Sequence, residues 1–198
     1  MSFGTIDMLD GSSIMYENNV VPMSGSNLFL LSSTLLTMSQ SSITLRNFVS
    51  PELLSKYSGS FFSVSTTATL SNGSTIDVSN ITITGKGVGS TFQKAHVFTF
   101  RDLTMNSGSK IRVTDCDIPS YSGNQNDRMD ERKYRPIWFH VGRNAAQGGG
   151  YAHPGFSKLT MTEGSVIAIL NCTSQQVSPR NVTTIRIDSF NADNTSAF

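Results

Sequence analysis

A nine-residue pattern, Gly108-Ser109-Lys110-Ile111-Arg112-Val113-Thr114-Asp115-Cys116, occurs in five copies, the other four spanning residues 11–19, 40–48, 73–81 and 164–172. The sixth position is aliphatic or tyrosine, and the eighth is asparagine in four copies and aspartate in one. The fourth position is always isoleucine: Ile14, Ile43, Ile76, Ile111 and Ile167. One residue type at one offset in five copies indicates a repeat architecture, in which each copy is one structural unit.

A second pattern precedes each copy and consists of an apolar, a polar and an apolar residue, which is typical of a short strand with one buried face. The five triplets are Ile6-Asp7-Met8, Leu36-Thr37-Met38, Ala68-Thr69-Leu70, Leu103-Thr104-Met105 and Leu159-Thr160-Met161. The corner that follows the triplet is polar and contains glycine in four copies, because glycine adopts the positive φ of a tight turn. In the second copy a glutamine takes this place and the corner is one residue shorter.

A third apolar stretch precedes four of the copies, so the unit is strand, corner, strand, corner and strand. Equivalent positions advance by 29, 33, 35 and 56 residues, with no helical period between them. Strands that recur at such a spacing predict a parallel β-helix, in which like residues stack into files through the core. The longest step predicts a large insertion before the last coil, made of the loops 118–135 and 142–156.

Alternation of side chains along a strand should point the fourth and sixth residues inward and place the eighth on the same side. A buried amide stack of Asn18, Asn47, Asn80 and Asn171 would then hydrogen-bond from coil to coil. The triplet threonines should form an outward file of ordinary strand surface, made of Thr37, Thr69, Thr104 and Thr160. Cys116 and Cys172 share the ninth position, and a coil spacing of about 4.8 Å is compatible with stacked free thiols and with a disulfide.

The composition excludes several classes of function. Charged residues make up 15% of the 198 residues and the net charge is +1, so no broad field would attract nucleic acid or an anionic membrane. No apolar run has the length of a membrane span, which needs about 20 residues. The three histidines are not at metal-ligand spacing, and there is no zinc, nucleotide or Gly-x-Ser-x-Gly motif, so we expect neither a metal nor a cofactor.

Candidate site residues gather in and beside the insertion. Seven of the nine residues in 127–135 are charged, and the carboxylates Asp127, Asp130 and Glu131 are the weak catalytic candidates. The ligand-binding candidates are Lys110, Arg112, Tyr134, Trp138, Tyr151 and His153. Carboxylates and aromatic side chains in one cleft could bind or cleave a polysaccharide. The alternative is a solvated, salt-bridged insert that packs over one face of the β-helix.

Five Asn-x-Ser/Thr sequons occur in the chain. The glycosylation candidates are Asn72, Asn181 and Asn194, which we place in a corner and in the C-terminal segment. Asn80 and Asn171 also lie in sequons, but a glycan would not fit on the inward amide stack.

The repeats resemble those of pectin-lyase-like right-handed β-helix proteins, through the apolar-Thr-Met, polar-Gly-Ser and Ile-x-Val-x-Asn patterns. Within that group they are similar to the large surface repeat proteins of trypanosomatids, the dispersed gene family. The resemblance covers roughly residues 5–117 and 157–173. It implies a cell-surface protein with an adhesive role. Polysaccharide lyases and polygalacturonases share the fold, but their paired aspartates and Gly-His-Gly motif are not matched here.

We therefore predict an all-β, right-handed parallel β-helix of about five coils, forming one domain over residues 1–198. We interpret the chain as a fragment of a longer solenoid, or as one that stacks end to end with its own copies. The expected function is a structural or adhesive module at the cell surface or outside the cell, with protein or glycan ligands and no nucleic acid or membrane insertion. The alternative is a carbohydrate-active enzyme that uses the 118–156 region, and the sequence favours the non-catalytic function.

Overall fold

The structure is a computed structural model that describes residues 2–20, 23–24, 29–50, 53–54, 59–83, 95–117, 137–142, 157–173, 185–187 and 189–197. All regular structure among these residues is β-strand. The strands are β1 (Ser2–Met8), β2 (Ser13–Val20), β3 (Met23–Ser24), β4 (Phe29–Ser39), β5 (Ser42–Ser50), β6 (Leu53–Leu54), β7 (Gly59–Ser71), β8 (Thr75–Ile83), β9 (Ala95–Met105), β10 (Lys110–Thr114), β11 (Ile137–Val141), β12 (Leu159–Met161), β13 (Val166–Leu170), β14 (Ile185–Ile187) and β15 (Phe190–Ala192).

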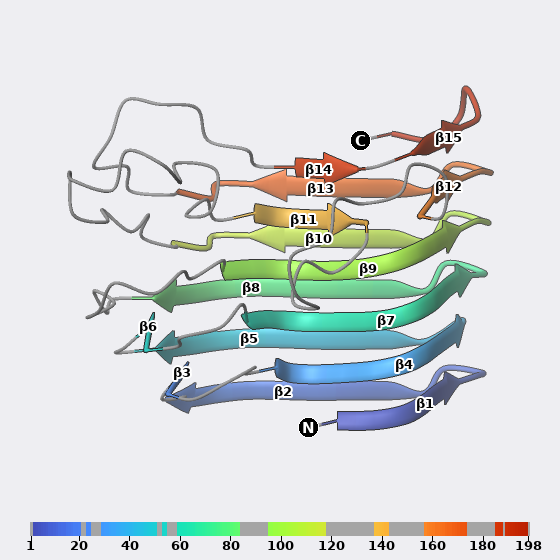
Figure 1. Cartoon of the computed structure of the whole chain (residues 1–198). Coiled ribbons are helices and arrows are strands. Elements are labelled where there is room, and N and C mark those ends of the chain that lie inside the picture. Colours follow the sequence, from blue (N-terminus) through green and yellow to red (C-terminus); the bar gives the residue numbers. More distant parts are fainter. Residues whose placement is uncertain are drawn as a thin grey trace.

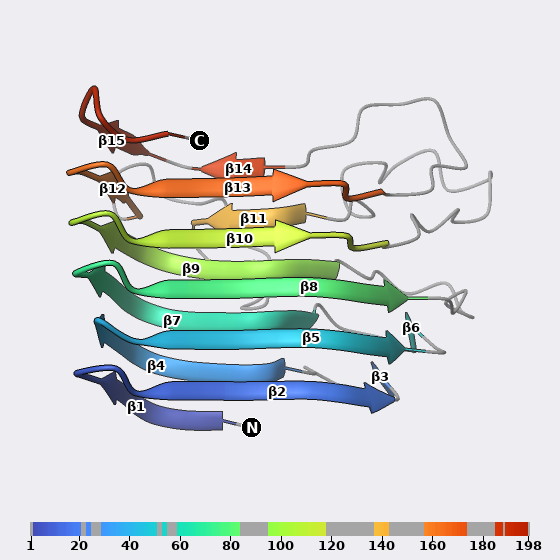
Figure 2. The same cartoon turned by 180° about the vertical axis from the view of Figure 1, so that it is seen from behind.

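The strands stack as rungs along one axis, with the N-terminal and C-terminal ends of the chain at opposite ends of the stack (Figures 1 and 2). All five copies of the nine-residue pattern lie in one five-stranded sheet of order β13-β10-β8-β5-β2. An eight-stranded sheet follows the order β1-β4-β7-β9-β11-β14, and β12 and β15 extend it. Every pairing between these strands is parallel, which confirms the predicted all-β solenoid.

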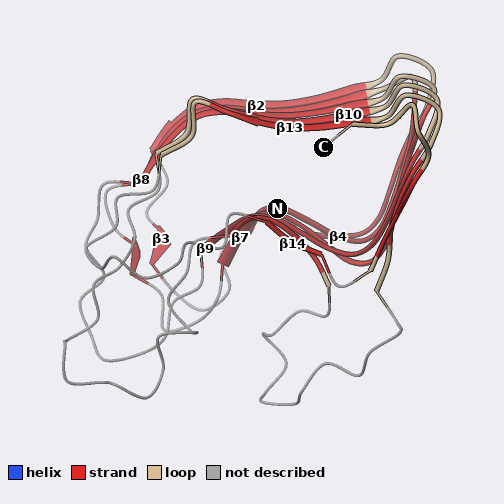
Figure 3. Ribbon diagram, turned by 90° about the horizontal axis from the view of Figure 1, so that it is seen from above, coloured by secondary structure: helices blue, strands red, loops and turns tan. Residues whose placement is uncertain are grey.

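The eight-stranded sheet bends, so that the view down the axis shows two sides of the coil made by the same strands (Figure 3). The register of the paired strands shifts at this bend, between Ser33 and Leu35 and again between Val64 and Thr67. After β9, two separate strands take the place of one continuous strand: β11 pairs with the first half of β9 and β12 with the second half. The division between them falls at the bend. Of the two predicted loops, 142–156 thus connects β11 to β12 at the bend, where the ladder is already irregular, while 118–135 lies between β10 and β11.

The solenoid comprises about three turns rather than the five expected. The repeat count did predict the five rungs of the five-stranded sheet. In the eight-stranded sheet, however, only β1, β4, β7 and β9 are continuous strands. The three steps between these four strands are the complete turns. In the later turns the strands are shorter, since β11 and β12 have five and three residues where β9 has eleven.

The predicted isoleucine file is confirmed. Ile14, Ile43, Ile76, Ile111 and Ile167 are paired in register across β2, β5, β8, β10 and β13. The middle three have no exposed surface, while Ile14 on the first rung is partly exposed. Facing them, the triplet residues of the other sheet form two further buried files, and the triplet threonines form the expected outward file.

Four of the corners are tight turns with two consecutive residues at positive φ, the second of which is glycine. At the third corner Asn72 has φ 53° and Gly73 has φ 72°, and the Ser74 amide donates to the Ser71 carbonyl at 3.1 Å. This is the geometry of a type I′ turn, which requires positive φ at both central positions. The shortened second corner keeps one positive-φ residue, Gln40 at 49°, as the missing residue predicts.

A buried serine file runs behind these turns, and the sequence interpretation missed it. The second position of the pattern is serine in every copy, and four of these serines are buried: Ser41, Ser74, Ser109 and Ser165. The Oγ atoms of the last three each donate to the carbonyl three residues earlier at 2.6 Å. At this position the serine hydroxyl donates its hydrogen bond to a carbonyl of the preceding turn. It can therefore be buried at little cost in free energy.

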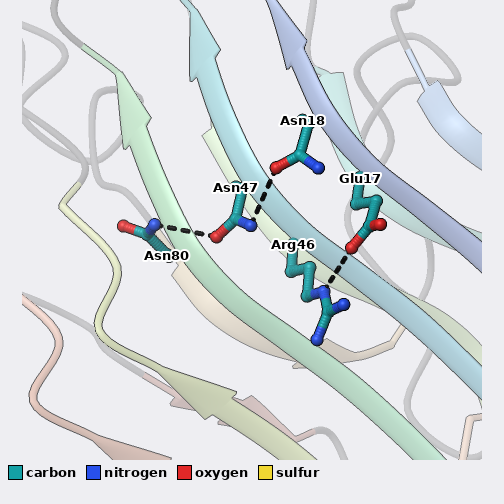
Figure 4. A network of polar contacts seen from close by, with 5 residues as sticks. All are labelled: Glu17, Asn18, Arg46, Asn47 and Asn80. Carbon is teal, nitrogen blue, oxygen red and sulfur yellow. Dashed lines mark hydrogen bonds and ion pairs between the residues drawn. The ribbon is translucent and has the colours of Figure 1, made fainter.

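The asparagine ladder exists, but its predicted burial is wrong. The eighth position has positive φ in every copy, for example 59° at Asn47, so the strand bends there and the side chain turns outward. Asn47 Nδ2 donates to Asn18 Oδ1 and Asn80 Nδ2 donates to Asn47 Oδ1, both at 2.9 Å (Figure 4). The ninth residue points inward instead, as Phe48, Ile81 and Cys116 show.

Asp115 interrupts this ladder. In each bond the amide of the later rung donates to the earlier rung, and Asn171 Nδ2 likewise donates to Asp115 Oδ1 at 3.2 Å. An ionised carboxylate has no proton to donate, so Asp115 cannot donate a hydrogen bond to the Asn80 side chain. The ladder is therefore two separate segments, one on each side of the junction between β8 and β10.

A sixth, degenerate copy of the corner ends the described chain, and it too was missed. The triplet Phe190-Asn191-Ala192 pairs in register with Leu159-Thr160-Met161, and Ala197 bridges to Val166. Asp193 organises this corner by accepting hydrogen bonds from the Glu163 amide at 2.6 Å and from the amides and hydroxyls of Thr195 and Ser196. These bonds hold the pKa of Asp193 well below its usual range, the Glu163 amide having the largest effect.

The replacement Asp193→Asn should show its effect in the pH dependence of unfolding. A carboxyl whose folded pKa is depressed stabilises the fold above its unfolded pKa, about 3.9, and loses that contribution as the pH falls. We expect wild type to melt at a higher temperature than the variant near neutral pH. The difference should shrink below about pH 4. A constant difference between pH 7 and pH 3 would show that the charge of Asp193 contributes nothing to stability.

Candidate functional site on the outer face of the five-stranded sheet

The outer face of the five-stranded sheet is a grid of short side chains with a few charged groups. One outward row consists of Ser13, Ser42, Thr75, Lys110 and Val166, and the next of Met15, Thr44, Asp77, Arg112 and Ala168. Rungs in a sheet are about 4.8 Å apart and alternate residues about 7 Å apart, so the grid has fixed spacings. Most of the neighbouring side chains in these rows are short, so the long side chains of Lys110 and Arg112 on β10 project beyond them.

Lys110 and Arg112 are the sequence-predicted binding residues that the structure places on this face. Arg112 is exposed and lies directly across from Asp77 on β8 and Ala168 on β13, while Lys110 lies across from Thr75 and Val166. Among the described residues neither cation forms an ion pair or hydrogen bond with another side chain. Two cations beside one carboxylate leave a local excess of positive charge.

Asp77 is half-buried between these cations and the neighbouring strands. Burial raises its pKa above the ordinary value, and the positive charges of Arg112 and, to a smaller extent, Lys110 oppose that rise. Desolvation of a carboxylate is offset only by close partners, and here the cations stand near but not in contact. Arg112 and Lys110 are thus not committed to Asp77 and can meet an external anion.

A different arrangement occurs on the first two rungs. Arg46 Nε lies 2.5 Å from Glu17 Oε2, beside the asparagine ladder (Figure 4). Both side chains are partly exposed, and such a surface pair contributes little to stability. Arg46 is therefore an occupied cation on the same face, which makes it a matched control for Arg112.

A shallow hollow of about 740 Å³ lies at the corner edge of this face. Its lining comes from the first three corners: Asp10, Gly11, Ser12, Gln40, Ser41, Ser42, Asn72, Gly73 and Thr75. The second corner is one residue shorter than its neighbours, so it recedes between them. The sequence predicted the missing residue but not the depression that it leaves, because the depression depends on the two flanking turns.

Most of the other predicted site residues lie outside the described residues. These are Asp127, Asp130, Glu131, Tyr134, Tyr151 and His153, together with the side chain of Trp138. The catalytic hypothesis for the insertion therefore stays a prediction. Within the described ranges no group of three or more histidine, cysteine, aspartate or glutamate side chains could hold a metal ion.

Four of the five sequon asparagines are described, and all four are exposed: Asn72, Asn80, Asn171 and Asn194. Burial, the reason for excluding Asn80 and Asn171 as glycan sites, is contradicted, because the bend at the eighth position turns both side chains to solvent. Asn181 lies outside the described residues.

Comparisons with protein-family models, with curated proteins and with solved structures gave no match. The structure thus supports the resemblance to pectin-lyase-like proteins only as far as the parallel β-solenoid fold, and no family match supports it further. No described helix is long and apolar enough to cross a membrane.

Proposed function

We propose that this protein is an adhesive or structural β-solenoid module, which binds an anionic glycan or an acidic protein surface through the outer face of its five-stranded sheet. The observation that carries the proposal is the pair of cations Lys110 and Arg112, which have no ion-pair partner among the described residues and lie on a rung fixed from both sides by β8 and β13. Cations held in place on a rigid strand lose little conformational freedom when a carboxylate or sulfate binds.

The surrounding grid fits such a ligand. Hydroxyl side chains such as Thr44 and Thr75 donate and accept hydrogen bonds, as sugar hydroxyls require. The hollow at the shortened corner lies along the same edge, beside Ser42 and Thr75. A repeating polymer matches a surface whose features recur at the rung spacing. A cell-surface or extracellular location, and the narrower likeness to trypanosomatid surface proteins, belong to this proposal and rest on the repeat resemblance.

The test is binding of the whole chain to polygalacturonate, with a neutral galactan as reference. We expect binding to polygalacturonate that weakens with salt, and a loss of about tenfold in affinity for each cation removed in Lys110→Ala and Arg112→Ala. The control Arg46→Ala should remain within about twofold of wild type, because its charge is already paired. Equal affinity of wild type and the double variant would reject this face as the binding site.

The alternative, a carbohydrate-active enzyme, rests on side chains of the 118–156 region. A turnover assay on acidic and neutral polysaccharides would test it, with Asp130→Ala and Glu131→Ala as the variants. Turnover that persists in both variants would eliminate these carboxylates as catalytic groups.

A further inference from the structure

The two cysteines of the chain occupy equivalent places on adjacent rungs. Thr114 pairs with Leu170, and Asp117 bridges to Thr173, so Cys116 lies directly across from Cys172. The Thr173 amide donates to the Cys116 carbonyl at 2.8 Å, which fixes the two backbones at this point. Neighbouring strands about 4.8 Å apart fall within the Cα separation that a disulfide spans, about 4.4–6.8 Å.

Their side chains also point the same way. Both follow a positive-φ residue, Asp115 or Asn171, which turns the ninth position toward the core. Each Sγ lies 3.2 Å from the carbonyl oxygen two residues earlier, which shows the same orientation on both rungs. Cys172 Sγ also lies 3.6 Å from the Val113 carbonyl oxygen, so it leans toward the rung that carries Cys116.

The two thiols differ in access. Cys116 is 1% exposed, whereas Cys172 is only partly buried. A hydrogen bond from Cys116 lowers the pKa of Cys172 to about 7, while the same contact and burial raise the pKa of Cys116. Cys172, the more accessible thiol, is thus the better nucleophile near neutral pH, and the buried Cys116 lies on the adjacent rung.

Both thiols are free in this structure, which is one of the two states that the sequence left open. We propose that they form a modification site, at which a hydroperoxide closes a disulfide between the rungs of β10 and β13. Cys172 reacts first and Cys116 resolves the intermediate.

The chemistry balances with the hydroperoxide as oxidant. The Cys172 thiolate attacks the terminal peroxide oxygen; an S–O bond forms, the O–O bond breaks, and the departing alkoxide or hydroxide takes up a proton. Cys116 gives up its proton and attacks the sulfenic sulfur, so that an S–S bond forms and water leaves. Two thiols and one hydroperoxide yield one disulfide, one alcohol or water, and one water.

The test uses the whole chain, reduced and freed of reductant, then treated with hydrogen peroxide. Because the chain contains only two cysteines, its intact mass after alkylation reports both at once. We expect untreated protein to take up two alkyl groups. Treated protein should take up none and lose two hydrogen atoms, with a Cys116–Cys172 cross-link in the peptide map and a higher melting temperature.

Two serine variants test the order of events. In Cys116→Ser, Cys172 should be trapped as a sulfenic acid by dimedone. In Cys172→Ser, Cys116 should react at least about tenfold more slowly, because it is buried and lacks thiolate character. The proposal is overturned if both thiols of treated wild type can still be alkylated, if the disulfide forms between chains, or if the two variants react at equal rates.

Discussion

Replacement of Phe98 by alanine is expected to lower the free energy of unfolding by about 3–5 kcal/mol, the usual cost of such a cavity in a core. Phe98 has no exposed surface, and its ring centroid lies 5.7 Å from that of Phe62, 5.9 Å from Phe100 and 6.1 Å from Phe139. It therefore links three consecutive rungs of the eight-stranded sheet. Chemical denaturation of the variant and of wild type measures the loss.

The matched control is Phe3→Ala, the same substitution on the first rung. Phe3 is 42% exposed, so its removal opens no closed cavity and should cost less than about 1 kcal/mol. The contrast tests the packing of the solenoid directly, because both residues lie in the same sheet. Similar losses in the two variants would contradict the placement of Phe98 in the core.

The next largest effect is expected at Asn47, the middle of the asparagine ladder. Its amide donates to Asn18 and accepts from Asn80, and its φ of 59° is unfavourable for alanine. Asn47→Ala should therefore lose part of two hydrogen bonds and strain the backbone, at a cost of about 2 kcal/mol. Thermal or chemical unfolding of purified variants provides the measurement.

A second substitution at the same position separates the two contributions. Asn47→Gly keeps the positive φ without strain and removes only the amide, so it should cost about 1 kcal/mol. If the glycine variant is as unstable as the alanine variant, the backbone argument fails. If both are as stable as wild type, the ladder is only a surface feature.

The sequence predicted those parts of the fold that repeat. The environment of a residue such as Ile76 recurs on every rung. Comparison of the five copies of the pattern therefore predicts from the sequence alone that its side chain points inward. The short corner at Gln40 was predictable for the same reason, since a missing residue is visible against its copies. The serines at the second position repeat in the same way, but their burial was not predicted, because serine is usually exposed.

The errors arose where the backbone departs from a regular strand. Alternation predicted an inward Asn80, but positive φ at this position reverses the direction of the side chain, and asparagine is the residue that accepts such a φ most readily. The corner at Asp193 escaped notice because it lacks both the glycine and the isoleucine. The handedness of the coil stays a prediction. The roles of the insertion residues also stay predictions, because no repeat constrains the insertion and most of its candidate residues lie outside the described part of the chain.

The 56-residue step between equal positions of β10 and β13 has an entropic consequence. The cost of closing a flexible loop grows only with the logarithm of its length, so this step costs about 0.5 kcal/mol more than the 33-residue step between β5 and β8. One ladder hydrogen bond is worth as much. The stacked rungs can therefore carry a long insert between β10 and β13 at a small entropic cost, and β13 still pairs with β10 in register.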